Sequence, residues 1–291
     1  MPKIDESPPV TLCWGTAIGT PLEPLIEAAG GAGLQAITLT AGMYEAARAE
    51  GSSAARLRRL LRENGLKVEA IDPLISALPG TPRPEEVAPA NRPFFEFTEQ
   101  RCFAAAEALE AETVNLAHFG GGAVPEEAFV DCLGPLAERA RRHGIRLTLE
   151  FLPESAIGDF GTAQRIVTAV GAKNLGMMFD TWHFARTHWD LDRLVAAPPG
   201  LITGLQICDR RPPEPGTPYT PMFGRLLPGE GELDLVPLLK VLLAREPGLR
   251  VGVEVFSEEL KALRPAQIAR RVAAATRPLL AAAGATRIPS P

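Results

Sequence analysis

The sequence predicts an α/β protein built as a single (β/α)8 TIM barrel, on three observations. Short apolar runs rich in β-branched residues recur along the whole chain of 291 residues. Helical patterns separate these runs, and eight strand–helix units of roughly 35 residues fit the length of such a barrel. No G-x-G-x-x-G motif follows the first run, which disfavours the alternative, an open doubly wound sheet.

Eight runs predict the strands in chain order. Several are apolar on both faces, as parallel strands covered by helices are. The first four are VTLCW (10–14), AITLT (36–40), VEAID (68–72) and TVNLA (113–117). The last four are RLTLEF (146–151), LGMMF (175–179), LITGLQI (201–207) and RVGVEV (250–255).

Helical patterns occupy the intervals between the strands. Residues 52–64 begin at a serine pair and are followed by Gly65, which are start and stop signals of a helix. Residues 125–142 carry acidic residues in their first turn and basic residues in their last, as the helix dipole favours. The other expected helices are 21–32, 92–110, 160–170, 190–197, 233–245 and 264–281. We expect residues 10–282 to form the catalytic domain, with loose tails at 1–9 and 283–291.

Charge, cysteine spacing and the length of the apolar runs argue against several classes of function. The chain carries 30 basic and 35 acidic residues, a net charge of −5, so we expect no general positive field for nucleic acid. Its four cysteines form no C-x-x-C motif, which argues against structural zinc and a disulfide framework. There is neither a signal-like start nor an apolar run near the roughly 18 residues of a membrane helix. We therefore expect a cytoplasmic protein that binds neither nucleic acid nor membrane.

Acidic residues follow the predicted strands at their carboxyl ends, where the active site of a (β/α)8 barrel lies. Glu150, Asp180 and Glu254 end strands five, six and eight, and Gln206 lies in strand seven. Three converging carboxylates would repel one another unless a cation or protons neutralised them. Carboxylate and amide oxygens suit Mn²⁺ or Mg²⁺, with Co²⁺ or Zn²⁺ as alternatives. We predict one divalent metal ion held by these four residues.

Further candidates surround the same rim. His183 is expected to lean over the substrate from the loop after strand six. Two long Pro-rich loops, 73–93 and 209–231, are expected to cover the site. Arginines in the second loop are candidates for binding a substrate anion, with ion pairs to neighbouring glutamates as the alternative. The candidate substrate-binding residues are Trp14, Asp72, His118, Trp182, Arg186, Arg210, Arg225 and Phe256.

These motifs resemble the xylose isomerase-like TIM-barrel superfamily, which includes sugar phosphate isomerases and epimerases, inosose dehydratase-like enzymes and family 2 AP endonucleases. The resemblance rests on LTLEF, FDTWH, LQICD and VGVEVF at the strand ends. It extends to GRLLPGEGELDL, which is similar to the R-x-x-P-G-E-G stretch of many members. The endonuclease branch uses many histidines for a trinuclear zinc site, whereas this chain has four histidines in all.

The resemblance implies that Glu150, Asp180, Gln206 and Glu254 match the four metal ligands of the family. Most members have His at the third of these places, and Gln is similar to the 3-dehydroshikimate dehydratase branch. That branch carries a His two residues after the strand-five Glu, where this chain has Leu152. The departure speaks against a standard dehydroshikimate dehydratase.

The resemblance implies a divalent-metal-dependent isomerase or epimerase acting on a small polyhydroxylated ketone or hydroxy-keto acid. Glu150 and Glu254 would take and return a proton through an enediolate, while His183 polarises a substrate oxygen. The alternative is a metal-dependent lyase similar to 3-dehydroshikimate or inosose dehydratase. A barrel that has lost catalysis and serves binding is a third hypothesis. A homodimer is the partner that the resemblance implies.

Overall fold

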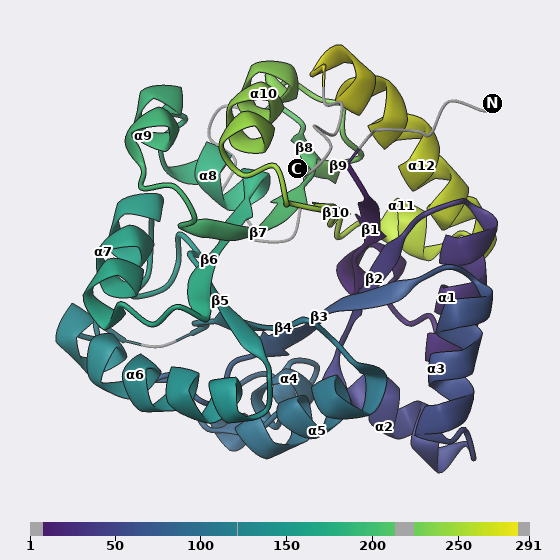
Figure 1. Cartoon of the computed structure of the whole chain (residues 1–291), viewed down its shortest axis with the longest axis horizontal. Helices are drawn as coiled ribbons and strands as arrows, with labels where there is room; N and C mark the ends of the chain where they lie inside the picture. Colours follow the sequence, from purple (N-terminus) through teal and green to yellow (C-terminus); the bar gives the residue numbers. More distant parts are fainter. Residues whose placement is uncertain (1–7, 121, 213–223, 285–291) are drawn as a thin grey trace.

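The computed structural model describes residues 8–120, 122–212 and 224–284. Eight parallel strands close into a barrel in the order β1-β10-β7-β6-β5-β4-β3-β2 (Figure 1), which confirms the predicted fold class. The barrel strands are β1 (Val10–Leu12), β2 (Ala36–Leu39), β3 (Lys67–Leu74), β4 (Thr113–Ala117), β5 (Arg146–Glu150), β6 (Leu175–Asp180), β7 (Ile202–Ile207) and β10 (Val251–Val253).

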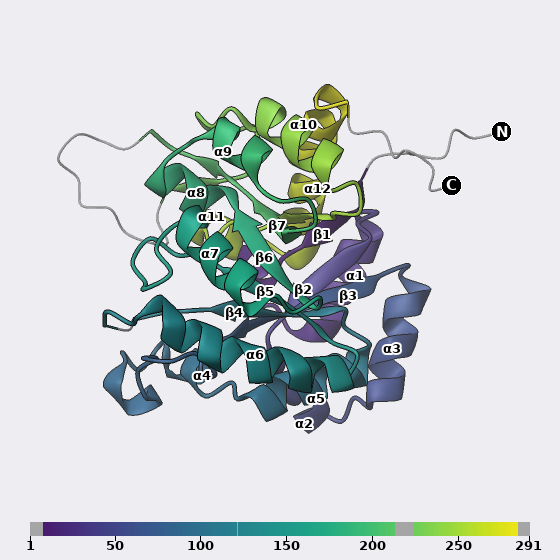
Figure 2. The same ribbon diagram turned by 60° about the vertical axis from the view of Figure 1, so that its left-hand side comes forward.

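Helices pack around the outside of the barrel and bury its outer face (Figures 1 and 2). They are α1 (Leu22–Gly31), α2 (Ala41–Ala49), α3 (Ala54–Glu63), α4 (Arg92–Phe95), α5 (Glu99–Leu109), α6 (Glu126–Arg142), α7 (Phe160–Val170), α8 (Thr181–Thr187), α9 (Leu191–Ala196), α10 (Leu235–Arg245), α11 (Glu258–Lys261) and α12 (Pro265–Ala282). Two 3₁₀ turns, η1 (Trp14–Ala17) and η2 (Pro84–Glu86), lie after β1 and β3. None of these helices is both long and apolar enough to cross a membrane.

Side-chain caps explain where several helices begin. The Ser53 hydroxyl accepts the Arg56 N–H at the start of α3, as the serine signal predicted. The Thr40 hydroxyl starts α2 in the same way, a helix that the sequence analysis did not anticipate. The predicted helix 92–110 is two helices, because the Thr98 hydroxyl caps a new start at α5. A short antiparallel pair, β8 (Asp209–Arg210) with β9 (Arg225–Leu226), follows β7 and was also not predicted.

Strand register brings the polar strand ends to one level. Asp180, the last residue of β6, pairs with Gln206 in β7, and Gln206 pairs in turn with Gly252 of β10. Glu150, the last residue of β5, pairs with Met178 of β6. Because side chains alternate along a strand, this register sends the polar ends of four neighbouring strands to the same mouth.

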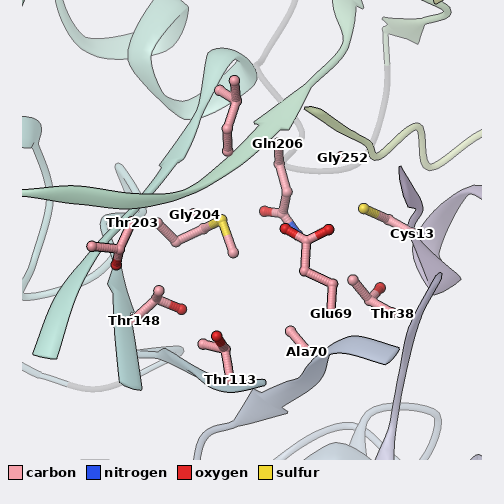
Figure 3. Close-up of a pocket in the computed structure, with 12 residues that line it drawn as sticks. Cys13, Thr38, Glu69, Ala70, Thr113, Thr148, Thr203, Gly204, Gln206 and Gly252 are labelled. Atoms are coloured by element: carbon pink, nitrogen blue, oxygen red, sulfur yellow. The ribbon is translucent and has the colours of Figure 1, made fainter. Parts of the chain in front are cut away.

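The barrel interior holds a small cavity of about 10 Å³ (Figure 3), which is roughly the space of one water molecule. Glu69 of β3 extends into this interior, and its carboxylate accepts the Thr11 hydroxyl. Burial raises the pKa of Glu69, and the Thr11 hydrogen bond opposes that shift. The remaining lining is mostly threonine and small residues: Thr38, Ala70, Thr113, Thr148, Thr203, Gly204 and Gly252.

Replacing Glu69 with Gln is expected to raise the melting temperature above that of the wild type at about pH 8. When an acidic group has a higher pKa in the folded protein than in the unfolded chain, folding becomes less favourable as the pH rises. The loss begins near the pKa of the unfolded chain, about 4.3 for Glu, and continues until the pH exceeds the pKa of the folded state. The gain should therefore shrink as the pH falls from about 8 toward about 5, because a growing share of folded Glu69 is then protonated. Thermal unfolding at both pH values measures it, with exposed Glu63→Gln as the control. Equal gains at both pH values would contradict the prediction.

Candidate active site

Three buried side chains meet at the carboxyl ends of β5 and β6. Glu150, Asp180 and His183 each offer one ligand atom, and these atoms lie within 4.8 Å of one another. His183 Nε2 is 3.4 Å from Glu150 Oε1 and 3.5 Å from Asp180 Oδ2. The prediction that a loop carries His183 is wrong, because Asp180 accepts the Trp182 N–H and starts helix α8 at once. One turn of that helix sets His183 beside Asp180.

Arg225 of β9 is buried between two of the predicted metal ligands. Its Nη1 lies 3.1 Å from Asp180 Oδ2 and 3.6 Å from Glu254 Oε2. The guanidinium carbon sits 4.9 Å from the centre of the Phe256 ring and 5.3 Å from that of Trp182. Burial alone would lower the pKa of Arg225, but attraction from Asp180 and the other acidic groups around it outweighs burial and raises that pKa. The candidate anion-binding arginine therefore already neutralises protein carboxylates.

A hydrogen-bond network joins β3, β4, β5 and β7 beneath this cluster. Asn115 Nδ2 donates to Asp72 Oδ1 at 2.9 Å and to Glu150 Oε2 at 2.8 Å. The Thr148 hydroxyl donates to Asn115 Oδ1 at 2.7 Å, and Gln206 Nε2 donates to Asp72 Oδ2 at 3.2 Å. The sequence analysis missed Asn115, although a polar residue inside the apolar run TVNLA was a usable signal.

The pKa shifts record an excess of buried acidic groups. Burial raises the pKa of Asp72 to about 7, repulsion from Glu150 adds to the rise, and hydrogen bonds from Asn115 and Gln206 oppose it. Burial raises the pKa of Glu254 well above its usual value, and the negative charge of Asp72 adds to this. A positive charge held among these groups would lower the cost of ionising them.

The donor atoms fit a divalent cation. Gln206 Oε1 and Glu254 Oε1 are both buried and make no hydrogen bond within the described part of the chain. An oxygen left without a donor in a protein interior is costly unless another group binds it. Carboxylate and amide oxygens are ligands that Mg²⁺ and Mn²⁺ favour, whereas His183, the third member of the cluster with Glu150 and Asp180, offers nitrogen.

An aromatic wall borders the cluster. The Trp14 ring lies 5.6 Å from the Phe256 ring, edge to face, and 5.4 Å from that of Phe94. The structure thus places the predicted residues Trp14 and Phe256 together. Phe94 was missed: it lies on α4, within the predicted helix 92–110, and no sequence signal indicated that this turn packs against Trp14.

Four other predicted substrate-binding residues have protein partners. Arg186 pairs with Glu154, and Trp182 is buried under the Arg225 guanidinium. Arg210 contacts Glu232 at 2.7 Å and donates to the Ala185 carbonyl. His118 accepts the Ala156 N–H and packs edge-on against Phe129. The Glu232 contact supports the ion-pair alternative for Arg210, and Arg186, the separate anion-binding candidate, is likewise paired with a glutamate. Residues 213–223 of the second predicted loop lie outside the described residues.

Part of the chain is similar in sequence to enzymes named as inosose isomerases. The chain is 31% identical over 132 residues to an inosose isomerase of Halalkalibacterium halodurans, a match that covers 45% of this chain and 46% of the relative. It is 30% identical over 138 residues to the inosose isomerase of Bacillus subtilis, covering 46% and 48%. The chain thus matches about half the length of these relatives.

Solved structures extend the likeness in fold to the whole barrel. An IolI protein with a bound zinc atom superposes with a TM-score of 0.80 at 20% identity, covering 94% of this chain and 98% of that one. An L-ribulose 3-epimerase gives 0.70 at 17% identity over 94% and 95% of the two chains. The probable 3-DHS dehydratase AsbF of Bacillus anthracis gives 0.68 at 14% identity over 89% and 97%.

The family model described as the xylose isomerase-like TIM barrel matches residues 26–279, which include β2 to β10 and every candidate metal ligand. This span agrees with the resemblance inferred from the strand-end motifs. The chain therefore belongs to the family of xylose isomerase-like TIM barrels.

Proposed function

We propose that this protein is a divalent-metal-dependent enzyme that isomerises or epimerises a small sugar-like ketone by moving a proton next to its carbonyl group. Two observations carry the proposal: the buried Glu150–Asp180–His183 cluster, and the buried oxygens Gln206 Oε1 and Glu254 Oε1, which accept no hydrogen bond from the described residues. The relatives named as inosose isomerases and the epimerase of the same fold support the substrate class.

The residues proposed to hold the metal are Glu150, Asp180, Gln206 and Glu254. When bound, a divalent cation supplies positive charge that stabilises the negative charge developing on the substrate carbonyl oxygen. His183 Nε2 lies within 3.5 Å of both Glu150 and Asp180, so the imidazole can donate to a substrate oxygen held there. Mn²⁺ or Mg²⁺ is the proposed ion, because the four ligands present only oxygen.

Glu150 and Glu254 are the proposed proton carriers. Strands β6 and β7 separate β5 from β10 in the barrel, so the two carboxylates approach the site from different sides. One can remove the proton from the substrate carbon while the other returns a proton to the opposite face. Positioned acid–base groups of this kind accelerate reactions by about 10²–10⁴-fold.

A lyase is the second candidate, favoured by one residue. The dehydroshikimate dehydratase branch, which this sequence resembles, also has Gln at the position of Gln206. A probable 3-DHS dehydratase also shares the fold. In that case proton removal by the same carboxylates would be followed by loss of a β-hydroxyl group. Leu152, at the place of that branch's His, makes this the weaker candidate.

The test is turnover of inosose, L-ribulose and 3-dehydroshikimate in D₂O, followed by proton NMR. The wild type with Mn²⁺ is expected to put solvent deuterium into recovered sugar and to form an isomer without loss of water. EDTA should stop the exchange, and added Mn²⁺ should restore it. A conjugated product absorbing in the ultraviolet would instead assign the lyase. Exchange that persists in EDTA would contradict the metal dependence.

A further inference from the structure

The two oxygens of Asp72 are both acceptors for side-chain amides. Gln206 Nε2 donates to Oδ2, and Asn115 Nδ2 donates to Oδ1. A side-chain amide donates only through its nitrogen, so each of the two amides turns its nitrogen end toward an accepting oxygen of Asp72. The orientation of a Gln amide is decided by the hydrogen bonds it makes, and here the nitrogen is committed to Asp72. The oxygen end of Gln206 is therefore the buried end that accepts no hydrogen bond from any residue that the structure describes.

We propose that Asp72 is a positioning residue that turns the Gln206 amide so that its oxygen, and not its nitrogen, faces the cation site. The inference rests on the proposed function only in requiring that the site binds a divalent cation. It replaces the predicted substrate-binding role of Asp72, because both carboxylate oxygens are already engaged within the protein. Figure 3 shows the Gln206 side chain reaching from β7 into the barrel interior.

The same carboxylate also steadies a second ligand through Asn115. The other hydrogen of Asn115 Nδ2 is directed at Glu150 Oε2. The Thr148 hydroxyl donates to Asn115 Oδ1, and a flip of the Asn115 amide would break its hydrogen bonds to both Asp72 and Glu150. Asp72 thus orients Gln206 directly and Glu150 through one intermediate, although Asp72 itself is not proposed as a ligand. Such supporting partners commonly change metal affinity by about 10–100-fold.

The polarity of the Asp72–Gln206 pair gives a sharp test. In Asp72→Asn, position 72 has one acceptor oxygen for two amide donors, so either Gln206 or Asn115 loses its partner. In the double variant Asp72→Asn with Gln206→Glu, the new amide at 72 donates to a carboxylate at 206, whose second oxygen still faces the site. The formal charge of the pair is the same as in the wild type, but the hydrogen bond runs in the opposite direction.

Mn²⁺ affinity, measured by electron paramagnetic resonance without any substrate, is the readout. Asp72→Asn is expected to weaken binding by about 10–100-fold. The double variant should recover most of that loss. The matched control is Asp72→Ala with Gln206→Glu, which provides the same carboxylate at 206 without the orienting amide and should bind less tightly than the Asn double variant.

The outcomes separate the two proposals. Wild type that binds no Mn²⁺ would overturn the cation site and, with it, the role of Asp72. Wild type that binds Mn²⁺, with equal affinity in the two double variants, would overturn the positioning role alone. This comparison does not depend on the folding of the single variant. A lower melting temperature in Asp72→Asn with unchanged Mn²⁺ affinity would likewise reduce Asp72 to a structural residue.

Discussion

Replacing Glu254 with Gln is expected to reduce turnover by about 10²–10⁴-fold, because the variant keeps the shape of the side chain but removes a proton carrier. The lost carboxylate is also a proposed metal ligand, so Mn²⁺ binding should weaken in the same variant. Deuterium incorporation into the sugar that the wild type turns over measures the first effect.

The control for this prediction is Glu258→Gln, four residues further along. The Glu258 side chain is 79% exposed and lies on α11, so its charge is screened by solvent. Glu258→Gln should leave the exchange rate within about two-fold of the wild type. A normal rate in Glu254→Gln, at Mn²⁺ concentrations that saturate the variant, would remove Glu254 from the proton-transfer step.

Replacing Arg225 with Met is expected to destabilise the metal-free protein by about 3–5 kcal/mol. The change keeps an apolar side chain between Phe256 and Trp182 but leaves the buried Asp180 and Glu254 carboxylates without their counter-charge. Urea unfolding with EDTA measures the loss. Saturating Mn²⁺ should recover more stability in the variant than in the wild type, because the ion supplies the missing positive charge.

An exposed arginine provides the comparison for Arg225. Arg271 pairs with Glu259 at 3.3 Å, and both side chains face solvent, so Arg271→Met should cost at most about 1 kcal/mol. A loss in Arg225→Met no larger than in Arg271→Met would show that the buried carboxylates need no internal cation. The same stability gain with Mn²⁺ in variant and wild type would contradict the shared site.

Much of the fold followed from sequence because strand signals are local. The apolar, β-branched runs at 113–117 and 201–207 predicted strands, and the order of the strands along a (β/α)8 barrel determines which ends share a mouth. That reasoning placed Glu150, Asp180, Gln206 and Glu254 at one rim. The register of β6, β7 and β10 agrees with that placement.

The residues that contact these side chains could not be predicted from the sequence. Arg225 contacts Asp180, 45 residues away in the sequence, because β8 and β9 pair. The sequence has no two-residue turn motif that would predict this pairing. The role of Asp72 depends on Asn115 of the neighbouring strand β4 and on Gln206 of β7, a strand that only closure of the barrel brings near Asp72. His183 lies on a helix because Asp180 acts as an N-cap, a dual use that spacing alone does not reveal.

The level pairing of Asp180 with Gln206 and of Gln206 with Gly252 has a consequence for how this protein can change over generations. Deleting one amino acid within β7 would turn the side chain of Gln206 from the barrel interior toward the surrounding helices. One mutation would thus remove a proposed metal ligand. Insertions after the strands leave that alignment untouched. New substrate preferences are therefore expected to arise through lengthened or shortened connecting segments, with the strands inherited intact.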